Sequence, residues 1–237
     1  MEDKNTSNIE VPVVQLENVT ISHDSEPLLK GINITLNPGE FVYLIGKSGT
    51  GKTSLLRSLY ADLPVDCGNA TVCGFDVAKM RRRNIPRLRR RIGMVFQDFR
   101  LLNDRNVYAN LEFVLRATGW RRQNEIRTRI EETLTAVGIA DKSDEMPYRL
   151  SEGQQQRIGI ARALVGNPDL ILADEPTGNL DPVTSAEIIQ LLTDINRNTR
   201  TTMLISTHDF MTIDRFPARV LVCEGGTIVD SETQAAQ

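Results

Sequence analysis

The most chemically specific stretch of the sequence is Gly46 to Thr53, which reads GKSGTGKT. It matches the phosphate-binding pattern G-x-x-x-x-G-K-[ST] at every fixed position. Its glycines allow backbone N–H groups to turn inward toward phosphate oxygens, at the positive end of a following helix. We therefore expect a nucleoside triphosphate here, with Lys52 on the β- and γ-phosphates and the Thr53 hydroxyl on Mg²⁺. The nucleotide-binding residues expected in this loop are Gly46, Lys47, Ser48, Gly49, Thr50, Gly51, Lys52, Thr53 and Ser54.

Two carboxylates and a histidine follow further apolar runs. Asp174 and Glu175 come at the end of the run that begins at Leu170, and His208 follows Thr201 to Ser206. At the carboxyl end of a strand beside the phosphate loop, Asp174 is placed to hold Mg²⁺ through its water shell. Glu175 can orient or deprotonate an attacking water, and His208 can contact the γ-phosphate at the same sheet edge. Adjacent acids can also merely cap or solvate a turn.

A glutamine follows the apolar run Ile92 to Phe96 (IGMVF). Gln97 lies just past a buried strand, where it can contact a metal or a nucleophilic water. A change in that contact can then move the segment that follows Gln97. The candidate catalytic residues are therefore Glu175, His208, Gln97 and Lys52, and the candidate metal contacts are Thr53, Gln97 and Asp174.

A second anion site is predicted at Leu150 to Gln154, which reads LSEGQ. This segment opens a helix, and Ser151 is well suited to cap it. A capped helix N-terminus with a nearby glycine binds anions, and one chain rarely needs two such sites. If the second site serves the nucleotide of another copy, the active site is composite and the protein must pair.

His23 is a further candidate for contact with the nucleotide. It is predicted to lie in a loop between the first two strands, where a nucleotide base can stack. A solvated loop histidine is the alternative.

The elements that must position these residues follow from apolar spacing. Alternation at Val13 to Val19 and at Ile32, Ile34 and Leu36 predicts half-buried strands, and Phe41 to Ile45 (FVYLI) predicts the strand that feeds the phosphate loop. A helix is expected over Ser54 to Tyr60. A turn and the start of a helix are expected at Gly178 to Pro182, and a hairpin is expected around Gly225 and Gly226. Two apolar helical faces are expected in the middle of the chain. The two helical faces comprise Val107, Leu111, Val114, Leu115 and Thr118, then Ile126, Ile130, Leu134 and Val137, closed by Gly138.

Composition limits the class of protein. The 237 residues are 40% hydrophobic and 25% charged, which is typical of a globular chain with its own core. No apolar run is long enough to span a membrane, and the first residues lack the layout of a signal peptide. We therefore expect a soluble, intracellular protein that can still dock onto something in a membrane. The three cysteines, Cys67, Cys73 and Cys223, are expected to be unpaired thiols.

A basic run stands out against the formal net charge of −3. Residues Lys79 to Arg91 (KMRRRNIPRLRRR) include eight basic side chains and no acidic one. Direct nucleic-acid binding is not expected, because the chain as a whole is acidic and no aromatic residue is interleaved. Anionic lipid head groups and an acidic surface of a partner remain as alternatives.

Six motifs, in this order, make the chain resemble the ATP-binding subunits of ABC (ATP-binding cassette) systems over roughly residues 13 to 230. By this resemblance, GKSGTGKT corresponds to Walker A, Gln97 to the Q-loop, LSEGQ to the signature, LILADE (Leu170 to Glu175) to Walker B, GNLD (Gly178 to Asp181) to the D-loop and His208 to the switch histidine. The family implies that two copies sandwich two ATP molecules with Mg²⁺. Each ATP then lies between the Walker A motif of one copy and the signature of the other, here Ser151, Gly153 and Gln154.

The resemblance implies an α/β fold of the P-loop NTPase type, specifically that of the ABC ATPases. Such a fold has a mainly parallel core sheet with helices, an N-terminal antiparallel β region and an inserted helical subdomain. On this basis the chain is a single ABC ATPase domain over 1–237. Its core comprises 12–97 and 158–230, its helical subdomain with the signature about 98–157, and its flexible ends 1–11 and 231–237.

Two further stretches resemble one branch of the family. Ala173 to Asp181 (ADEPTGNLD) resembles the lipoprotein-release, macrolide-export and cell-division ATPases, and Phe96 to Leu111 resembles the FtsE cell-division type, particularly at Asp98 and the Asp104-Arg105 pair. This implies a homodimer, peripheral to the cytoplasmic face of the cell membrane, with an integral membrane partner of the FtsX type and control of cell-wall hydrolases. The alternative is the ATPase subunit of a lipoprotein-release or macrolide-type exporter. A soluble ABC-type ATPase acting on DNA or ribosomes fits less well, because such proteins usually carry two cassettes or a long coiled coil.

The sequence departs from the family pattern at two positions. Glu152 replaces the first glycine of the usual LSGGQ signature, and His23 falls where the family usually has an aromatic residue, often Tyr. A carboxylate near phosphate is unfavourable unless it points away, which is what we expect of Glu152.

The replacement Glu152→Gly tests this expectation. ATP affinity should change by less than about tenfold, or about 1.4 kcal/mol, because the carboxylate does not face the nucleotide. Titration with ATP measures the effect, and a larger gain in affinity would show that Glu152 opposes binding.

Overall fold

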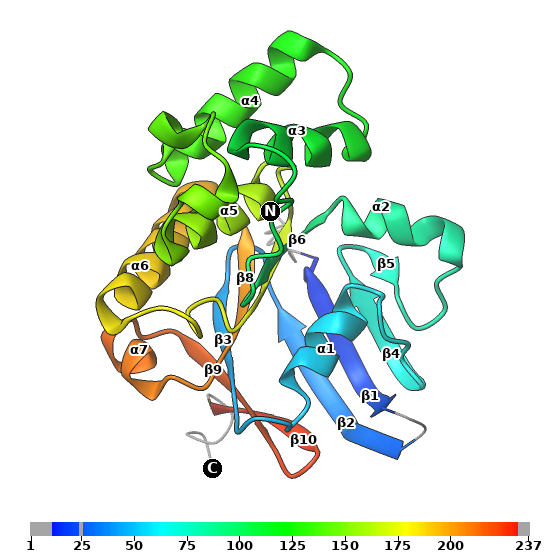
Figure 1. The fold of residues 1–237 in the computed structure, drawn as a ribbon. Coiled ribbons are helices and arrows are strands. Elements are labelled where there is room, and N and C mark those ends of the chain that lie inside the picture. Colours follow the sequence, from blue (N-terminus) through cyan, green and yellow to red (C-terminus); the bar gives the residue numbers. More distant parts are fainter. Residues whose placement is uncertain (1–10, 24–25, 232–237) are drawn as a thin grey trace, which may run out of the picture.

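The computed structural model describes residues 11–23 and 26–231, except for the side chain of His23. Its central element is a six-stranded sheet in the order β10-β9-β3-β8-β7-β6, in which the four strands β3, β8, β7 and β6 and their neighbour β9 run parallel (Figure 1). Only β10 is antiparallel, since it forms a hairpin with β9. The strands are β3 (Phe41–Ile45), β6 (Ile92–Phe96), β7 (Leu170–Asp174), β8 (Thr202–Thr207), β9 (Arg219–Glu224) and β10 (Thr227–Asp230).

The parallel strands are apolar almost throughout because both faces of the sheet are covered. Side chains alternate between the two faces. In β7, Ile171 and Ala173 belong to one buried cluster with the helices α3 to α6, whereas Leu170 and Leu172 belong to a second cluster with α1 and the antiparallel strands. The short continuous apolar runs of the sequence therefore become the central strands.

The second sheet is antiparallel and lies on the other side of α1, in the order β2-β1-β4-β5 (Figure 1). Strands β1 (Val14–His23) and β2 (Glu26–Leu36) form a long irregular hairpin, and β4 (Cys67–Val72) and β5 (Phe75–Asp76) complete the sheet. This is the predicted N-terminal antiparallel region. Strands β4 and β5 were not predicted.

Helices fill both sides of the central sheet, and α3 and α4 lie at one end of the molecule (Figure 1). Helix α5 packs against β6, and α3 and α4 pack against each other and against α5. The helices are α1 (Lys52–Leu59), α2 (Ile85–Arg89), α3 (Val107–Thr118), α4 (Gln123–Ala136), α5 (Glu152–Leu164), α6 (Pro182–Thr199) and α7 (Phe210–Arg215), with short 3-10 turns η1 (Arg82–Asn84), η2 (Ala140–Lys142) and η3 (Pro147–Arg149).

Several sequence predictions are confirmed in detail. The α/β fold with a mainly parallel sheet and inserted helices is present, and Gly138 follows α4 with a φ of 73°. Asp181 caps α6 through the N–H groups of Val183 and Thr184, with Pro182 at the first helical position. All three cysteines are free thiols. The helix predicted over Ser54 to Tyr60 begins two residues earlier, at Lys52.

Other predictions concern boundaries. The division into a core (12–97 and 158–230) and a helical subdomain (98–157) stays a prediction. The ends predicted to be flexible lie largely outside the described residues. No helix within the described residues is long and apolar enough to cross a membrane.

The close packing of α5 on β6 gives a test of the fold. A methyl group on Gly93 in β6 would lie 2.4 Å from the carbonyl oxygen of Ala163 in α5. Gly93→Ala should therefore lower the free energy of unfolding by about 1–3 kcal/mol through overpacking, and each kcal/mol should lower Tm by about 2–4 °C. Thermal unfolding followed by circular dichroism measures this.

The matched control is Gly166→Ala, because a methyl group there meets no atom within 4 Å. Its effect should stay within about 0.5 kcal/mol. Equal unfolding temperatures for the two variants would contradict the packing described for α5 and β6.

Candidate functional site

The candidate site lies at one edge of the central sheet, where four parallel strands end side by side. The register pairs Ile45 with Thr207, Asp174 with Ser206, and Phe96 with Asp174. Segments that follow these strands are therefore neighbours although they are far apart in sequence. The phosphate loop follows β3, His208 follows β8, Glu175 follows β7, and Gln97 follows β6.

The loop between β3 and α1 has a backbone that requires glycine. Gly46 has a φ of 153°, and a Cβ there would lie 2.4 Å from the carbonyl oxygen of Cys223 and 2.9 Å from Thr50 Oγ1. Gly51 has a φ of 108° and precedes the first turn of α1, where it offers no side chain to cap the helix. The N-terminal N–H groups of α1 thus face the loop, which is the arrangement that binds phosphate.

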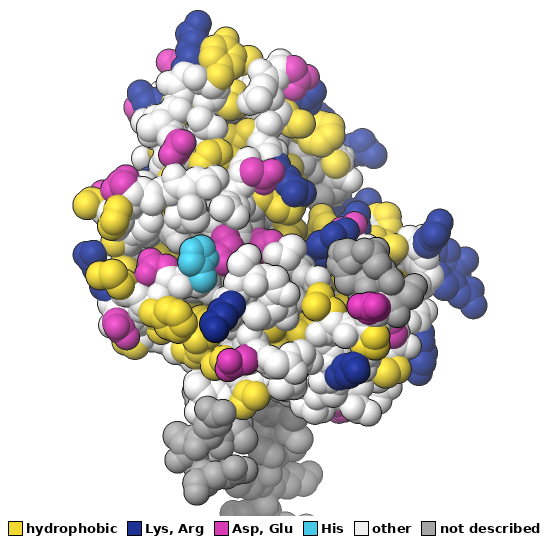
Figure 2. All heavy atoms as spheres, turned by 60° about the horizontal axis from the view of Figure 1, so that its bottom comes forward, with side chains coloured by type: hydrophobic (Ala, Val, Ile, Leu, Met, Phe, Trp, Pro, Cys, Tyr) yellow, Lys and Arg dark blue, Asp and Glu magenta, His cyan; other side chains and the backbone are white. Residues whose placement is uncertain are grey.

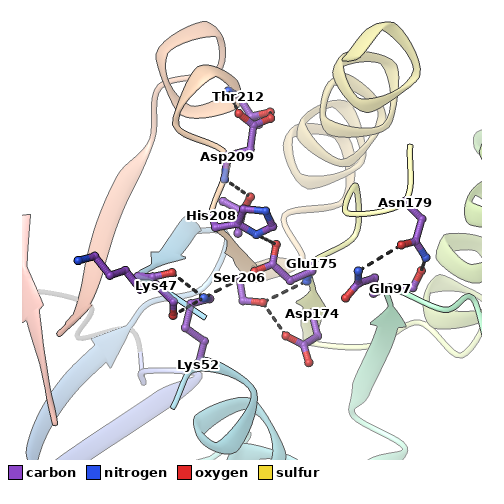
Figure 3. A network of polar contacts seen from close by, with 12 residues as sticks. Lys47, Lys52, Gln97, Asp174, Glu175, Asn179, Ser206, His208, Asp209 and Thr212 are labelled. Carbon is purple, nitrogen blue, oxygen red and sulfur yellow. Dashed lines mark hydrogen bonds and ion pairs between the residues drawn. The ribbon is translucent and has the colours of Figure 1, made fainter. Parts of the chain in front are cut away.

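Lys52 is buried and reaches back over the loop. Its ammonium donates to the carbonyl oxygens of Gly46 (2.7 Å) and Lys47 (3.2 Å), and it lies 3.6 Å from Glu175 Oε1 (Figure 3). A buried ammonium is stable only with such partners. It places a fixed positive charge between the loop and the end of β7.

The first carboxylate of the site, Asp174, lies between two hydroxyl groups. Its Oδ1 accepts from Ser206 Oγ at 2.7 Å and from Thr53 Oγ1 at 3.2 Å. Carboxylate and hydroxyl oxygens are hard ligands that suit Mg²⁺, and the pair sits directly beside the phosphate loop. The residues present therefore fit a bound Mg²⁺.

The second carboxylate, Glu175, is held in an unusual conformation. Its φ is 47°, which costs a non-glycine residue of the order of 1–3 kcal/mol. Its N–H donates to both the carbonyl oxygen and the hydroxyl of Ser206, each at 3.1 Å. Its carboxylate lies 2.8 Å from His208 Nδ1, and only 16% of the side chain is exposed, whereas His208 is 67% exposed (Figure 3). The structure thus brings Glu175, His208 and Lys52 together, as predicted.

Gln97 is joined to the turn that follows β7. Its Nε2 donates to Asn179 Oδ1 at 3.2 Å, and Asn179 Nδ2 donates to the Gln97 carbonyl at 3.0 Å (Figure 3). A Cβ on Gly178 would lie 2.8 Å from Gln97 Nε2, so the two segments touch. Gln97 therefore contacts the D-loop turn.

Of these groups, Lys52, Thr53, Gln97 and Glu175 line a cleft of about 740 Å³, and His208 lines a neighbouring cleft that also includes Glu175. The first cleft is lined by the phosphate loop, by Gln97 and Glu175, and by the start of β2. The lining residues are Glu26, Pro27, Leu28, Ser48, Gly49, Gly51, Lys52, Thr53, Ser54, Gln97 and Glu175. The volume and the polar lining suit a nucleotide.

The LSEGQ segment lines a different cleft, of about 340 Å³. That cleft and the first share no residue. Ser151 caps α5 as predicted: its Oγ accepts from Gln154 N–H, and Gln154 Oε1 accepts from Ser151 N–H. Ser151 and Glu152 are exposed, and a Cβ on Gly153 would lie 2.7 Å from Thr184 Cγ2. Within one chain, the signature residues are therefore not part of the phosphate-loop cleft.

The prediction of a loop at His23 is wrong. His23 is the last residue of β1, and its backbone pairs with that of Glu26 in β2. The hairpin therefore extends further than the alternation of apolar residues in the sequence indicated. The side chain of His23 lies outside the described residues, and base stacking there stays a prediction.

Two groups next to the site have a shifted pKa. Burial raises the pKa of the Cys223 thiol, which donates to the carbonyl oxygen of Thr50 in the phosphate loop. A hydrogen bond from the Thr184 hydroxyl lowers the pKa of Asp181. Cys223 is thus a neutral packing residue beneath the loop, and Asp181 is a charged cap.

Sequence reasoning missed two residues that organise the site. Ser206 connects the carboxylate of Asp174 to the backbone N–H of Glu175, but in the sequence it resembles any small residue within a buried strand. Asn179 belongs to the predicted GNLD turn, yet its pairing with Gln97 across 82 positions depends on the order of the strands. A polar residue at the end of an otherwise apolar run was the available signal for Ser206.

Comparison with known proteins gives a family and several relatives. Residues 29–178 match the ABC transporter family. The chain is 41% identical to the cell division ATP-binding protein FtsE of Streptococcus pneumoniae serotype 2, over 94% of this chain and 96% of that protein. It is 45% identical to FtsE of Mycobacterium tuberculosis, over 93% and 96% respectively. It is 37% identical to the methionine import ATP-binding protein MetN of Carboxydothermus hydrogenoformans, over 92% of this chain and 65% of that protein.

The fold also matches a solved structure, the dimeric bacterial ABC transporter cassette MJ0796. The TM-score is 0.80 with 34% identity, covering 91% of this chain and 96% of that one. A second structure of MJ0796, with the same TM-score, is described as a post-hydrolysis state bound to ADP and Pi.

The hydrogen bonds of Ser206 generate a prediction. Ser206→Ala should lower the free energy of unfolding by about 1–3 kcal/mol, because the charged acceptor Asp174 loses a buried donor. The control is Ser58→Ala, which also removes a buried hydroxyl, but one with no hydrogen-bond partner among the described residues. It should be neutral or slightly stabilising. Urea unfolding of both variants measures the difference, and equal losses would refute a role for the Ser206 hydroxyl.

Proposed function

Because this chain belongs to the ABC transporter family of ATPases, we propose that it is the ATP-hydrolysing subunit of a membrane-associated complex. The observation that carries the proposal is the meeting of the phosphate loop, Asp174, Glu175 and His208 at one edge of the sheet. The reaction is hydrolysis of the bond between the β- and γ-phosphates of ATP by water.

Within the family, the FtsE type is supported best. The chain covers 96% of the length of two proteins named FtsE, at 41% and 45% identity, whereas it covers 65% of a MetN protein at 37% identity. The complex would accordingly act in cell division, with an integral membrane partner of the FtsX type and control of cell-wall hydrolases. Lipoprotein release or macrolide-type export is the second candidate.

The loop and Lys52 bind the triphosphate. The N–H groups at the start of α1 face the loop, and the Lys52 ammonium has three protons, of which two go to loop carbonyls. The third N–H of Lys52 can donate to the β- and γ-phosphates, and its positive charge stabilises them. Thr53, Asp174 and Gln97 would hold Mg²⁺, which when bound neutralises charge on the phosphate oxygens.

Glu175 positions the attacking water and accepts its proton. Ser206 fixes the backbone of Glu175, while Lys52 and His208 flank its carboxylate. His208 is exposed enough to contact the γ-phosphate as well. A base positioned in this way contributes roughly 10²- to 10⁴-fold to the rate.

A second copy of the chain completes each site. The separation of the two clefts within one chain supports this, as does the dimer of the similar cassette MJ0796. Ser151, Gly153 and Gln154 of one copy would face the triphosphate held by the other, with the N-terminus of α5 directed at the phosphates.

The membrane partner would dock on the groove between α2, β6, α3 and α5. This groove, of about 420 Å³, includes apolar side chains such as Pro86, Met94 and Phe113, and Phe113 is 53% exposed. It lies beside Phe96, which precedes Gln97, so closure of the site can move the 98–157 subdomain and the partner together. The protein would be peripheral to the cytoplasmic face of the cell membrane, without direct nucleic-acid binding.

Copurification tests the choice of partner. The chain should copurify from membranes with an integral protein of the FtsX type, identified by mass spectrometry. An exporter or importer permease in its place would contradict the cell-division assignment and leave the ATPase assignment intact.

The role of Glu175 can be tested by Glu175→Gln. The variant should bind ATP but turn over roughly 10²- to 10⁴-fold more slowly, because the amide accepts no proton, and its ATP-bound dimers should persist. Lys52→Ala should instead weaken ATP binding itself. Steady-state hydrolysis, ATP titration and size-exclusion chromatography separate these effects, and near-normal turnover of Glu175→Gln would remove Glu175 from this role.

A further inference from the structure

A strongly basic surface lies outside the nucleotide site. Six basic side chains from Lys79 to Arg90 are exposed, and no ion pair joins them to a carboxylate of the described residues. We call this surface the basic face; it comprises Lys79, Arg81, Arg82, Arg83, Arg87 and Arg90. Figure 2 shows Lys and Arg side chains gathered at the right-hand edge of the molecule, where Figure 1 places η1 and α2.

The two other basic residues of the run hold the segment in place. Arg89 donates to the carbonyl oxygens of Tyr60 and Ala61, stacks over the Tyr60 ring at 4.5 Å and lies 3.6 Å from Asp62. Arg91 is paired with Asp169, and Leu88 is fully buried. Helix α2 is therefore fixed to the body of the protein. The six side chains of the basic face lie on and around η1 and α2, are exposed, and pair with no carboxylate of the described residues.

The charge of the chain is distributed unevenly. The formal net charge is −3, and the thirteen residues from Lys79 to Arg91 carry eight positive charges, so the remaining residues together carry −11. An anionic surface would therefore attract the basic face more strongly than the rest of the protein, whose net charge is negative. At physiological salt the attraction acts within about 8 Å, so contact would orient the molecule with the basic face inward.

We propose that the basic face binds the head groups of anionic phospholipids at the membrane surface. Long, flexible cations without an aromatic platform between them suit a fluid layer of phosphates, whereas single-stranded nucleic acid requires stacking partners. The face adjoins the proposed docking groove, whose lining includes Pro86, Arg89 and Arg90. The argument from the position beside the docking groove rests on the proposed function. The argument from charge does not depend on it.

Vesicle cosedimentation of the full chain, without any membrane partner, tests the proposal. The protein should bind phosphatidylglycerol vesicles and not phosphatidylcholine vesicles, and binding should weaken steeply as salt rises from about 0.01 M to 0.15 M. Each basic residue near an anionic surface contributes roughly fivefold in partitioning. The triple variant Arg81→Gln, Arg82→Gln, Arg83→Gln should therefore bind roughly a hundredfold more weakly.

The matched control carries the same loss of charge elsewhere. Arg121→Gln, Arg127→Gln, Arg197→Gln removes three exposed arginines that have no ion pair with the described carboxylates, and it should change vesicle binding by less than about threefold. Binding of a fluorescent ATP analogue should be unchanged in both variants, which shows that the fold and the nucleotide site are intact.

Three results would overturn the proposal. They are no binding of the wild-type chain to phosphatidylglycerol vesicles, an equal loss in both triple variants, and tighter binding to polyglutamate or to duplex DNA than to vesicles at the same salt. The last would identify an acidic polypeptide or nucleic acid as the partner. Because the membrane subunit is absent from the assay, the outcome is independent of whether an FtsX-type protein binds the groove.

Discussion

The parallel register of β3, β8, β7 and β6 is the constraint on which the site depends. It brings the ends of four strands to one line, and every candidate group of the phosphate-loop cleft is attached to one of those ends. Ser206 reinforces the arrangement, because one hydroxyl joins the carboxylate of Asp174 to the backbone of Glu175. A shift of β8 by one residue would turn this hydroxyl to the other face of the sheet and separate these groups.

Much of this architecture could be predicted from the sequence. Strands β6 and β7 are short apolar runs with a polar residue directly after them, and Asp181-Pro182 and Ser151 mark helix starts with local chemistry. The order of the strands could not be predicted in this way, since apolar runs do not specify their neighbours. For that reason the Gln97–Asn179 contact and the role of Ser206 were missed, and the extended hairpin at His23 was mistaken for a loop.

The single chain has the residues that bind phosphate, but within one chain the signature residues do not close over the phosphate loop. Its phosphate-loop cleft includes Glu175 but none of the signature residues, which form a cleft of their own. Under the proposed function, the nucleotide would join two copies of the chain and hydrolysis would let them separate, which would couple ATP to movement. The docking groove shares no lining residue with either of these clefts, and no residue of the basic face lines either cleft.

Complementation between two inactive variants tests the composite site most directly. Lys52→Ala lacks a functional phosphate loop and Ser151→Arg lacks a functional signature, so neither should hydrolyse ATP alone. In a mixed dimer, the intact loop of one copy meets the intact signature of the other, and an equal mixture should regain up to about a quarter of the wild-type rate. No recovery in mixtures shown to contain the mixed dimer, or full activity of Ser151→Arg alone, would contradict the account.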